Sequence, residues 1–95
     1  MYMYRTRIKE HLFTVNAHLE GKGDEPLTLK AVGERAHVPY NTVLRYANDA
    51  QGNPNYAVVD RIRRTLNELL PKAKQFGDAG YIYEDESLGQ PVAVA

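Results

Sequence analysis

The most informative segment of the chain comprises residues 28–48, TLKAVGERAHVPYNTVLRYAN. It opens on Thr28, whose hydroxyl is suited to accept a hydrogen bond from a first-turn N–H as a helix N-cap. Apolar residues then share one helical face as far as Ala36, and Pro39 follows three residues later. Proline suits the first turn of a new helix, because its missing N–H has no partner to lose there. The pattern predicts two short helices separated by about three residues.

The packing of these two helices can be predicted from their small and apolar residues. Two helices that cross at a steep angle need a very small residue at the crossing, and Gly33 supplies it. The residues expected to fill the junction are Val32, Ala36, Val38, Val43 and Tyr46. Most other positions of the second helix then point outward, whereas Leu44 either faces outward or joins the core. This is a helix-turn-helix arrangement.

Two longer helices are predicted on either side of this stretch. The spacings of three and four residues that mark amphipathic helices occur at Ile8, Leu12, Val15 and Leu19, and again at Val59, Ile62, Leu66 and Leu69. They predict helices over about residues 4–19 and 56–70. Residues 48–55 are rich in turn formers and predict a loop between the helices.

The C-terminal part of the chain gives a weaker pattern. Residues 81–83, Tyr-Ile-Tyr, have side chains that favour strands, and residues 90–95 are small and apolar and are expected to be disordered. We therefore predict an all-α fold, a compact domain of four to five helices. Its short C-terminal tail is either a strand or disordered.

Composition narrows the class of protein. A chain of 95 residues has room for one core, and 43% hydrophobic and 25% charged residues are typical of a globular domain. The sequence contains no cysteine, which excludes disulfides, thiolate chemistry and cysteine-ligated zinc. No apolar run approaches the ~20 residues that cross a bilayer, and the N-terminus does not resemble a signal peptide. We expect a cytoplasmic protein that does not bind membranes.

The net charge of zero conceals an asymmetry along the chain. Residues 1–77 hold all twelve basic and eight acidic residues, a net charge of +4. Residues 78–95 hold four acidic residues and no basic one, a net charge of −4. A mildly basic body with an acidic tail suits a domain that binds a polyanion, although many domains with as much charge bind none.

Known protein families share the pattern of the central stretch. The run Thr-Leu-Lys-x-Val-x-x-x-Ala-x-Val-x-Tyr-x-Thr-Val-x-Arg, residues 28–45, resembles the DNA-binding headpiece of the Lac repressor family. In its wider layout, residues 7–70 are more similar to the phage Cro and lambda-type repressor family. The resemblance implies a lambda-repressor-like fold and a helix-turn-helix DNA-binding domain over residues 1–74. It leaves an acidic tail over residues 75–95 for dimerisation or for a protein partner.

Two residues depart from the family pattern. His37 occupies the turn position where these families usually have glycine in a left-handed conformation, which histidine tolerates better than β-branched residues. Pro39 stands where a serine N-cap is usual, so the rigid ring of proline is expected to start the second helix.

The resemblance implies that the second helix lies in the major groove of DNA and reads base edges. Asn41 can then pair with adenine N6 and N7, and Arg45 with guanine O6 and N7. Tyr40 aligns with a base-contacting tyrosine of the Lac-type pattern, and Thr42 can contact a thymine methyl or a phosphate. We predict that these four residues contact bases. The structural alternatives are a packed Tyr40, a merely helix-starting Asn41 and a solvated Arg45.

Residues at the edges of the motif are expected to contact phosphates. Such contacts position a protein on DNA without reading its sequence. The predicted phosphate contacts are Thr28, Lys30, Arg35, His37, Asn53 and Asn55. Arg61, Arg63 and Arg64 are instead expected to form a solvated face paired with Asp60 or Glu68.

The sequence does not favour catalysis, a cofactor or a metal. It has no phosphate-binding glycine loop and no recognisable pair of catalytic carboxylates, so we do not expect an enzyme. His11 and His18 are seven residues apart rather than the four of a helical metal pair, and both are interpreted as surface residues.

The expected partners are double-stranded DNA and a second copy of the chain. A homodimer is predicted because one helix reads only about 4–5 base pairs, and repression is favoured over activation. The candidate dimer residues are Leu70, Phe76, Tyr81, Ile82 and Tyr83. Two alternatives stay open: an antitoxin that represses its own operon and binds a toxin through its tail, and a protein-interaction module that keeps the fold without the DNA.

Overall fold

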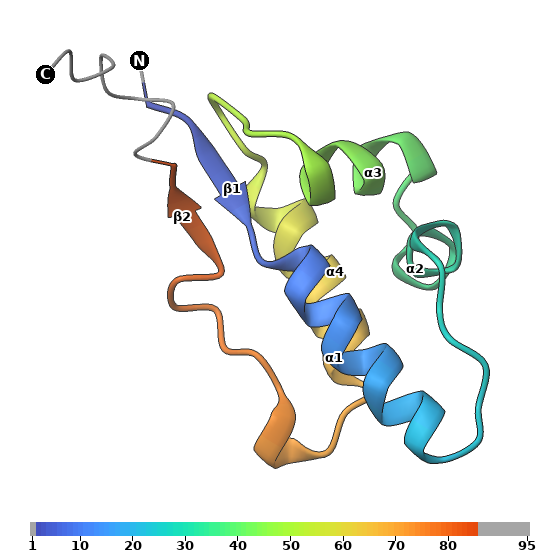
Figure 1. Ribbon diagram of the computed structural model, residues 1–95. Helices are drawn as coiled ribbons and strands as arrows, with labels where there is room; N and C mark the ends of the chain where they lie inside the picture. Colours follow the sequence, from blue (N-terminus) through green and yellow to red (C-terminus); the bar gives the residue numbers. More distant parts are fainter. Residues whose placement is uncertain (1, 86–95) are drawn as a thin grey trace, which may run out of the picture.

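Four α-helices and two short strands make up residues 2–85, the part of the chain that the computed structural model describes (Figure 1). In chain order the elements are β1 (Tyr4–Thr6), α1 (Ile8–Gly21), α2 (Leu29–Ala36), α3 (Tyr40–Asn48), α4 (Tyr56–Asn67), a single 3-10 turn (Lys72–Lys74) and β2 (Ile82–Glu84). The fold is thus mostly helical, with a small sheet added to it. The predicted disorder of residues 90–95 lies outside the described residues.

The sheet corrects the prediction that residues 4–19 form one helix. Tyr4–Thr6 is a strand, β1, which pairs antiparallel with β2 so that Arg5 lies opposite Tyr83. The apolar stripe that predicted the helix begins only at Ile8, and tyrosine and threonine favour strands once a partner is available. The strand alternative for the C-terminal segment is confirmed, shifted by one residue to Ile82–Glu84.

The core lies between the four helices, and the predicted apolar stripes supply most of it. Ile8, Val15, Ile62 and Leu66 are fully buried, and Val59 is nearly so. Leu12 and Leu69, one residue from each stripe, are only partly buried against the same cluster. The helical periodicity therefore predicted correctly which faces of α1 and α4 turn inward.

Residues 71–85, here called the strap, return from the end of α4 to the sheet along the orange and red trace of Figure 1. The strap packs against the domain, and Tyr81 is only 3% exposed. Leu70, just before the strap, is 6% exposed. These two residues belong to the core of one chain, which leaves little of their surface for the predicted dimer contact. Phe76, Ile82 and Tyr83 are partly buried.

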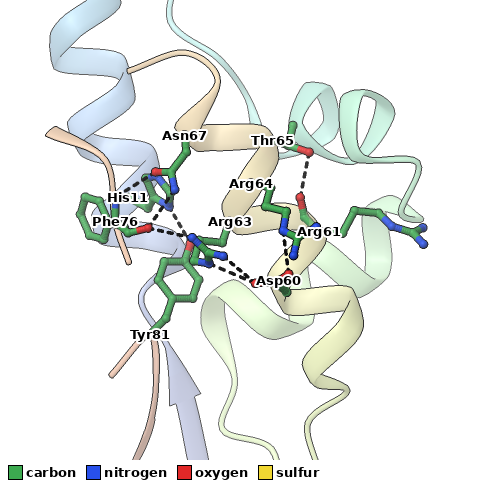
Figure 2. Close-up of polar contacts among 9 residues, drawn as sticks. All are labelled: His11, Asp60, Arg61, Arg63, Arg64, Thr65, Asn67, Phe76 and Tyr81. Atoms are coloured by element: carbon green, nitrogen blue, oxygen red, sulfur yellow. Dashed lines mark hydrogen bonds and ion pairs between the residues drawn. The ribbon is translucent and has the colours of Figure 1, made fainter. Parts of the chain in front are cut away.

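His11 anchors the strap, which corrects its interpretation as a surface residue. Its side chain is fully buried, its ring stacks on that of Phe76 at 4.2 Å, and Nδ1 shares a 2.8 Å hydrogen bond with the Tyr81 hydroxyl (Figure 2). Asn67 holds the backbone of Phe76 from both sides, through bonds of 2.8 Å to its N–H and its carbonyl. His11 lies three residues after Ile8 and four before Val15, so it shares the buried face of α1.

The connection between α2 and α3 has the geometry expected from the sequence. Thr28 caps α2 by accepting a hydrogen bond from the Ala31 N–H at 3.1 Å. His37 ends the helix in the left-handed conformation, with φ 57° and ψ 42°. Gly33 lies at the crossing, where an added Cβ would come within 2.7 Å of the Val38 carbonyl oxygen. The predictions for these three positions are confirmed.

Replacing His37 with glycine is expected to stabilise the protein by about 0.5–1 kcal/mol. The left-handed conformation costs an L-residue roughly 1–2 kcal/mol, which exceeds the extra backbone entropy that glycine loses on folding. Chemical denaturation of the variant measures the difference. In the control Glu34→Gly, which lies in α2 proper, the sign should reverse to a loss of about 1 kcal/mol. A destabilised His37→Gly would mean that the histidine side chain makes a contact that outweighs the strain.

Candidate nucleic-acid interface

The outward face of α3 carries the residues predicted to read bases. Val43, Tyr46 and Ala47 turn inward and are buried, whereas Asn41 and Arg45 are exposed. These two are four residues apart, so their side chains share one face of the helix. The structure therefore brings together the pair on which the sequence interpretation depends.

The side chains of Tyr40, Thr42 and Leu44 in α3 range from exposed to half-buried. Tyr40 is 45% exposed, so its ring is neither packed away nor fully solvated. Thr42 and Leu44 are half-buried, and Leu44 is not among the apolar side chains that pack against the core. The guanidinium of Arg45 lies 5.5 Å from the ring centroid of Tyr46, and no carboxylate in residues 2–85 forms an ion pair with it. An arginine without a protein counter-ion keeps its donors for a ligand.

The residues predicted to contact phosphates are all exposed, but they do not form one cluster. Thr28 and Lys30 lie at the start of α2, whereas Arg35 and His37 lie at its other end. Asn53 belongs to the loop after α3. Asn55 is the N-cap of α4, where its Oδ1 accepts a 3.2 Å hydrogen bond from the Val58 N–H. The side chains of Thr28 and Asn55 thus already serve as helix caps.

The inward face of α3 is held by hydrogen bonds that the sequence interpretation missed. The hydroxyl of Tyr46 accepts a bond from the Asn55 N–H at 3.0 Å, and the Tyr46 carbonyl accepts one from Thr6 Oγ1 at 2.8 Å. Thr6 is forty residues from its partner, so no local pattern could have revealed the second bond. These contacts join α3 to both β1 and the start of α4.

The arginines of α4 are arranged largely as predicted. Asp60 forms ion pairs with Arg63 at 2.7 Å and with Arg64 at 2.9 Å (Figure 2), and it accepts a hydrogen bond from Arg63 Nη2. The bond from Arg63 is the main reason that the pKa of the Asp60 carboxyl is lowered. Arg63 is not solvated, however, because its side chain is only 15% exposed and donates from Nη1 to the Phe76 carbonyl at 3.0 Å. Arg63 therefore holds the strap in place rather than forming part of a solvated surface.

Burial changes the acid–base properties of the residues that anchor the strap. Removal from water lowers the pKa of His11 from 6.5 to about 4, the Arg63 charge adds to the lowering, and Asn67 opposes it. The Nε2 atom of His11 has no hydrogen-bond partner among residues 2–85. Burial also raises the pKa of the Tyr81 hydroxyl. The pair is therefore neutral near pH 7 and makes a hydrogen bond without charge.

Within residues 2–85, no helix has the length and apolar character needed to cross a membrane. The same residues contain no group of three or more His, Asp or Glu side chains placed to hold a metal ion. Comparison with protein-family models, with curated proteins and with solved structures finds no match to this chain.

Proposed function

We propose that α2, the turn at His37 and α3 form a helix-turn-helix, and that the protein is a cytoplasmic, sequence-specific regulator that binds double-stranded DNA. The observation that carries the proposal is the pair Asn41 and Arg45, both exposed on one face of a short helix whose opposite face is buried. The resemblance of residues 7–70 to the phage Cro and lambda-type repressor family supports the same proposal.

The outward side chains of α3 have the chemistry that base readout needs. In the major groove, asparagine pairs with adenine and arginine with guanine through two hydrogen bonds each. Tyr40 and Thr42 lie on either side of Asn41 in the chain and contact neighbouring bases. Lys30, exposed at the start of α2, is placed beside free helix N–H groups and contributes a phosphate contact.

The regulator acts as a homodimer, because a single α3 helix reads too few base pairs to define a unique site. Two copies related by two-fold symmetry would place their α3 helices in successive turns of the groove, about 34 Å apart on a palindromic operator. A small domain bound there represses by excluding other proteins from the same DNA.

Selection of bound oligonucleotides from a random pool tests the proposal. The expected result is an enriched palindrome, with binding that weakens steeply as salt is raised because phosphate contacts release counter-ions. A protein-interaction module would enrich no sequence and show no such salt dependence. The proposed function fails if no sequence is enriched by the folded protein at low salt.

Arg45→Ala is expected to weaken binding to the selected sequence about 10- to 100-fold and to relax preference at one base position, since it loses a two-bond contact to guanine. Fluorescence anisotropy on matched and mutated sites measures both effects. Lys30→Ala should instead weaken binding to all sequences alike. Arg61→Ala, which removes an exposed arginine of α4, is the control and should change neither. If Arg45→Ala also changes neither, Arg45 does not read a base.

A further inference from the structure

The last turn of α3 receives its missing hydrogen bonds from β1. The final carbonyl groups of a helix have no N–H partner within the helix. Here Thr6 Oγ1 donates to the Tyr46 carbonyl at 2.8 Å, and Arg5 Nη1 donates to the Asn48 carbonyl at 3.0 Å. Thr6 is only 8% exposed, so its bond is shielded from water. Two consecutive strand residues thus cap the C-terminal end of the helix.

The residue before them holds the loop that follows α3. Tyr4 exchanges two backbone hydrogen bonds with Gln51, of 2.8 and 2.7 Å. Residues 46–51 are therefore hydrogen-bonded to three successive residues of the first strand, Tyr4, Arg5 and Thr6. We call these three residues the strand clamp.

The strand clamp is itself held by the strap. Its residues pair with β2, and Arg5 also forms an ion pair with Asp85. The backbone N–H of Arg7 donates to the Tyr81 carbonyl at 2.9 Å, next to the hydrogen bond between Tyr81 and His11. A continuous set of contacts therefore leads from the buried His11 through β2 and β1 to the end of α3.

We propose that Thr6 and Arg5 are positioning residues that set the angle at which α3 meets its ligand. The inference rests on the proposed function, since it assigns these residues a part in reading DNA without touching it. The turn at Gly33 and His37 holds one end of α3, and the strand clamp holds the other. Hydrogen bonds to base edges weaken steeply with misalignment, whereas phosphate contacts tolerate it better. Loss of the strand clamp therefore reduces specific binding more than non-specific binding.

The test compares Thr6→Val with Thr65→Val. Both replace a threonine that is 8–9% exposed and whose hydroxyl donates to a helix carbonyl at 2.8 Å, but Thr65 bonds to Arg61 within α4. Thr6→Val is expected to weaken binding to the selected sequence about three- to tenfold, as the loss of one hydrogen bond allows. Binding to random DNA should stay within twofold of the wild type. Thr6→Ser, which keeps the hydroxyl, should restore specific binding, and Thr65→Val should leave the ratio of specific to random binding unchanged.

A second measurement is independent of DNA. Hydrogen exchange of the amides in residues 47–51 should accelerate about three- to tenfold in Thr6→Val but not in Thr6→Ser or Thr65→Val. Thr6 Oγ1 also accepts a weaker bond from the Ile8 N–H at 3.4 Å, so exchange in the first turn of α1 is followed separately. If hydrogen exchange is faster only in α1, the proposal that Thr6 holds the end of α3 is overturned.

The two measurements separate the failures of the two proposals. If the wild type selects no DNA sequence, the proposed function fails, while exchange still decides whether β1 holds α3. If the wild type selects a sequence and Thr6→Val reads it as well as Thr65→Val does, the function stands and the positioning role of Thr6 is overturned. Arg5→Gln provides the same comparison for the Asn48 carbonyl.

Discussion

Gly33→Val is expected to destabilise the folded state by about 3 kcal/mol, as measured by chemical denaturation. An added Cβ would come within 2.7 Å of the Val38 carbonyl oxygen and 3.3 Å of Val43 Cγ2. The first of these contacts is to backbone and cannot be relieved by a side-chain rotation. The two further methyl groups of valine must also be accommodated, so α2 and α3 must separate. The separation would strain the 2.9 Å hydrogen bond from the Val38 N–H to the Gly33 carbonyl, which closes the turn.

Gly21→Val provides the matched control for this prediction. Gly21 ends α1, and a Cβ there would meet nothing within 4 Å. The control should therefore cost no more than a few tenths of a kcal/mol, since valine has no neighbour to displace and few helical contacts to lose. Gly33→Ala should lie between the two, because alanine gains helix propensity but still carries the close Cβ. Equal stability of Gly33→Val and Gly21→Val would contradict the close crossing of α2 and α3.

Lowering the pH from 7 to 4 is expected to remove about 3 kcal/mol of stability through His11 alone. Burial lowers the pKa of His11 to about 4 in the folded state, whereas an unfolded histidine titrates near 6.5. The unfolded chain therefore binds the proton first as the pH falls, and stability falls with it. The contribution is complete above about pH 6.5 and is lost progressively down to about pH 4. The charge of the nearby Arg63 guanidinium is one of the causes of this lowered pKa.

Comparison with His11→Leu isolates this effect from the carboxyl groups that titrate in the same range. Leucine fills a similar volume and takes up no proton, so the free energy of unfolding of the variant should depend less on pH between 7 and 4. The variant is expected to be less stable at pH 7, because it loses the stack on Phe76 and the bond to Tyr81. The difference between the pH dependence of the wild type and that of His11→Leu measures the contribution of His11. Parallel curves would mean that His11 is exposed to water.

Local sequence accounts for the geometry of the α2–α3 unit. The cap at Thr28, the left-handed turn at His37 and the close crossing at Gly33 each depend on residues within a few positions of one another. Helical periodicity depends on the same short range, which is why the buried faces of α1 and α4 were also predicted. The exposure of Asn41 and Arg45 followed, because burying one side of a short helix leaves the other side to solvent.

Long-range contacts, by contrast, set the structure at the two ends of the described chain. The pairing of β1 with β2 joins residues about 80 positions apart. A strand of three residues, Tyr4–Thr6, is too short for its local sequence to indicate such a distant partner. His11 was misjudged for the same reason: its polarity suggests the surface, and only Phe76 and Tyr81, 65 and 70 residues away, make its burial favourable. Periodicity reports which face of an element is covered, whereas long-range pairing depends on which surfaces the folded backbone brings together. The bond from Thr6 to α3 depends on this long-range arrangement of the backbone.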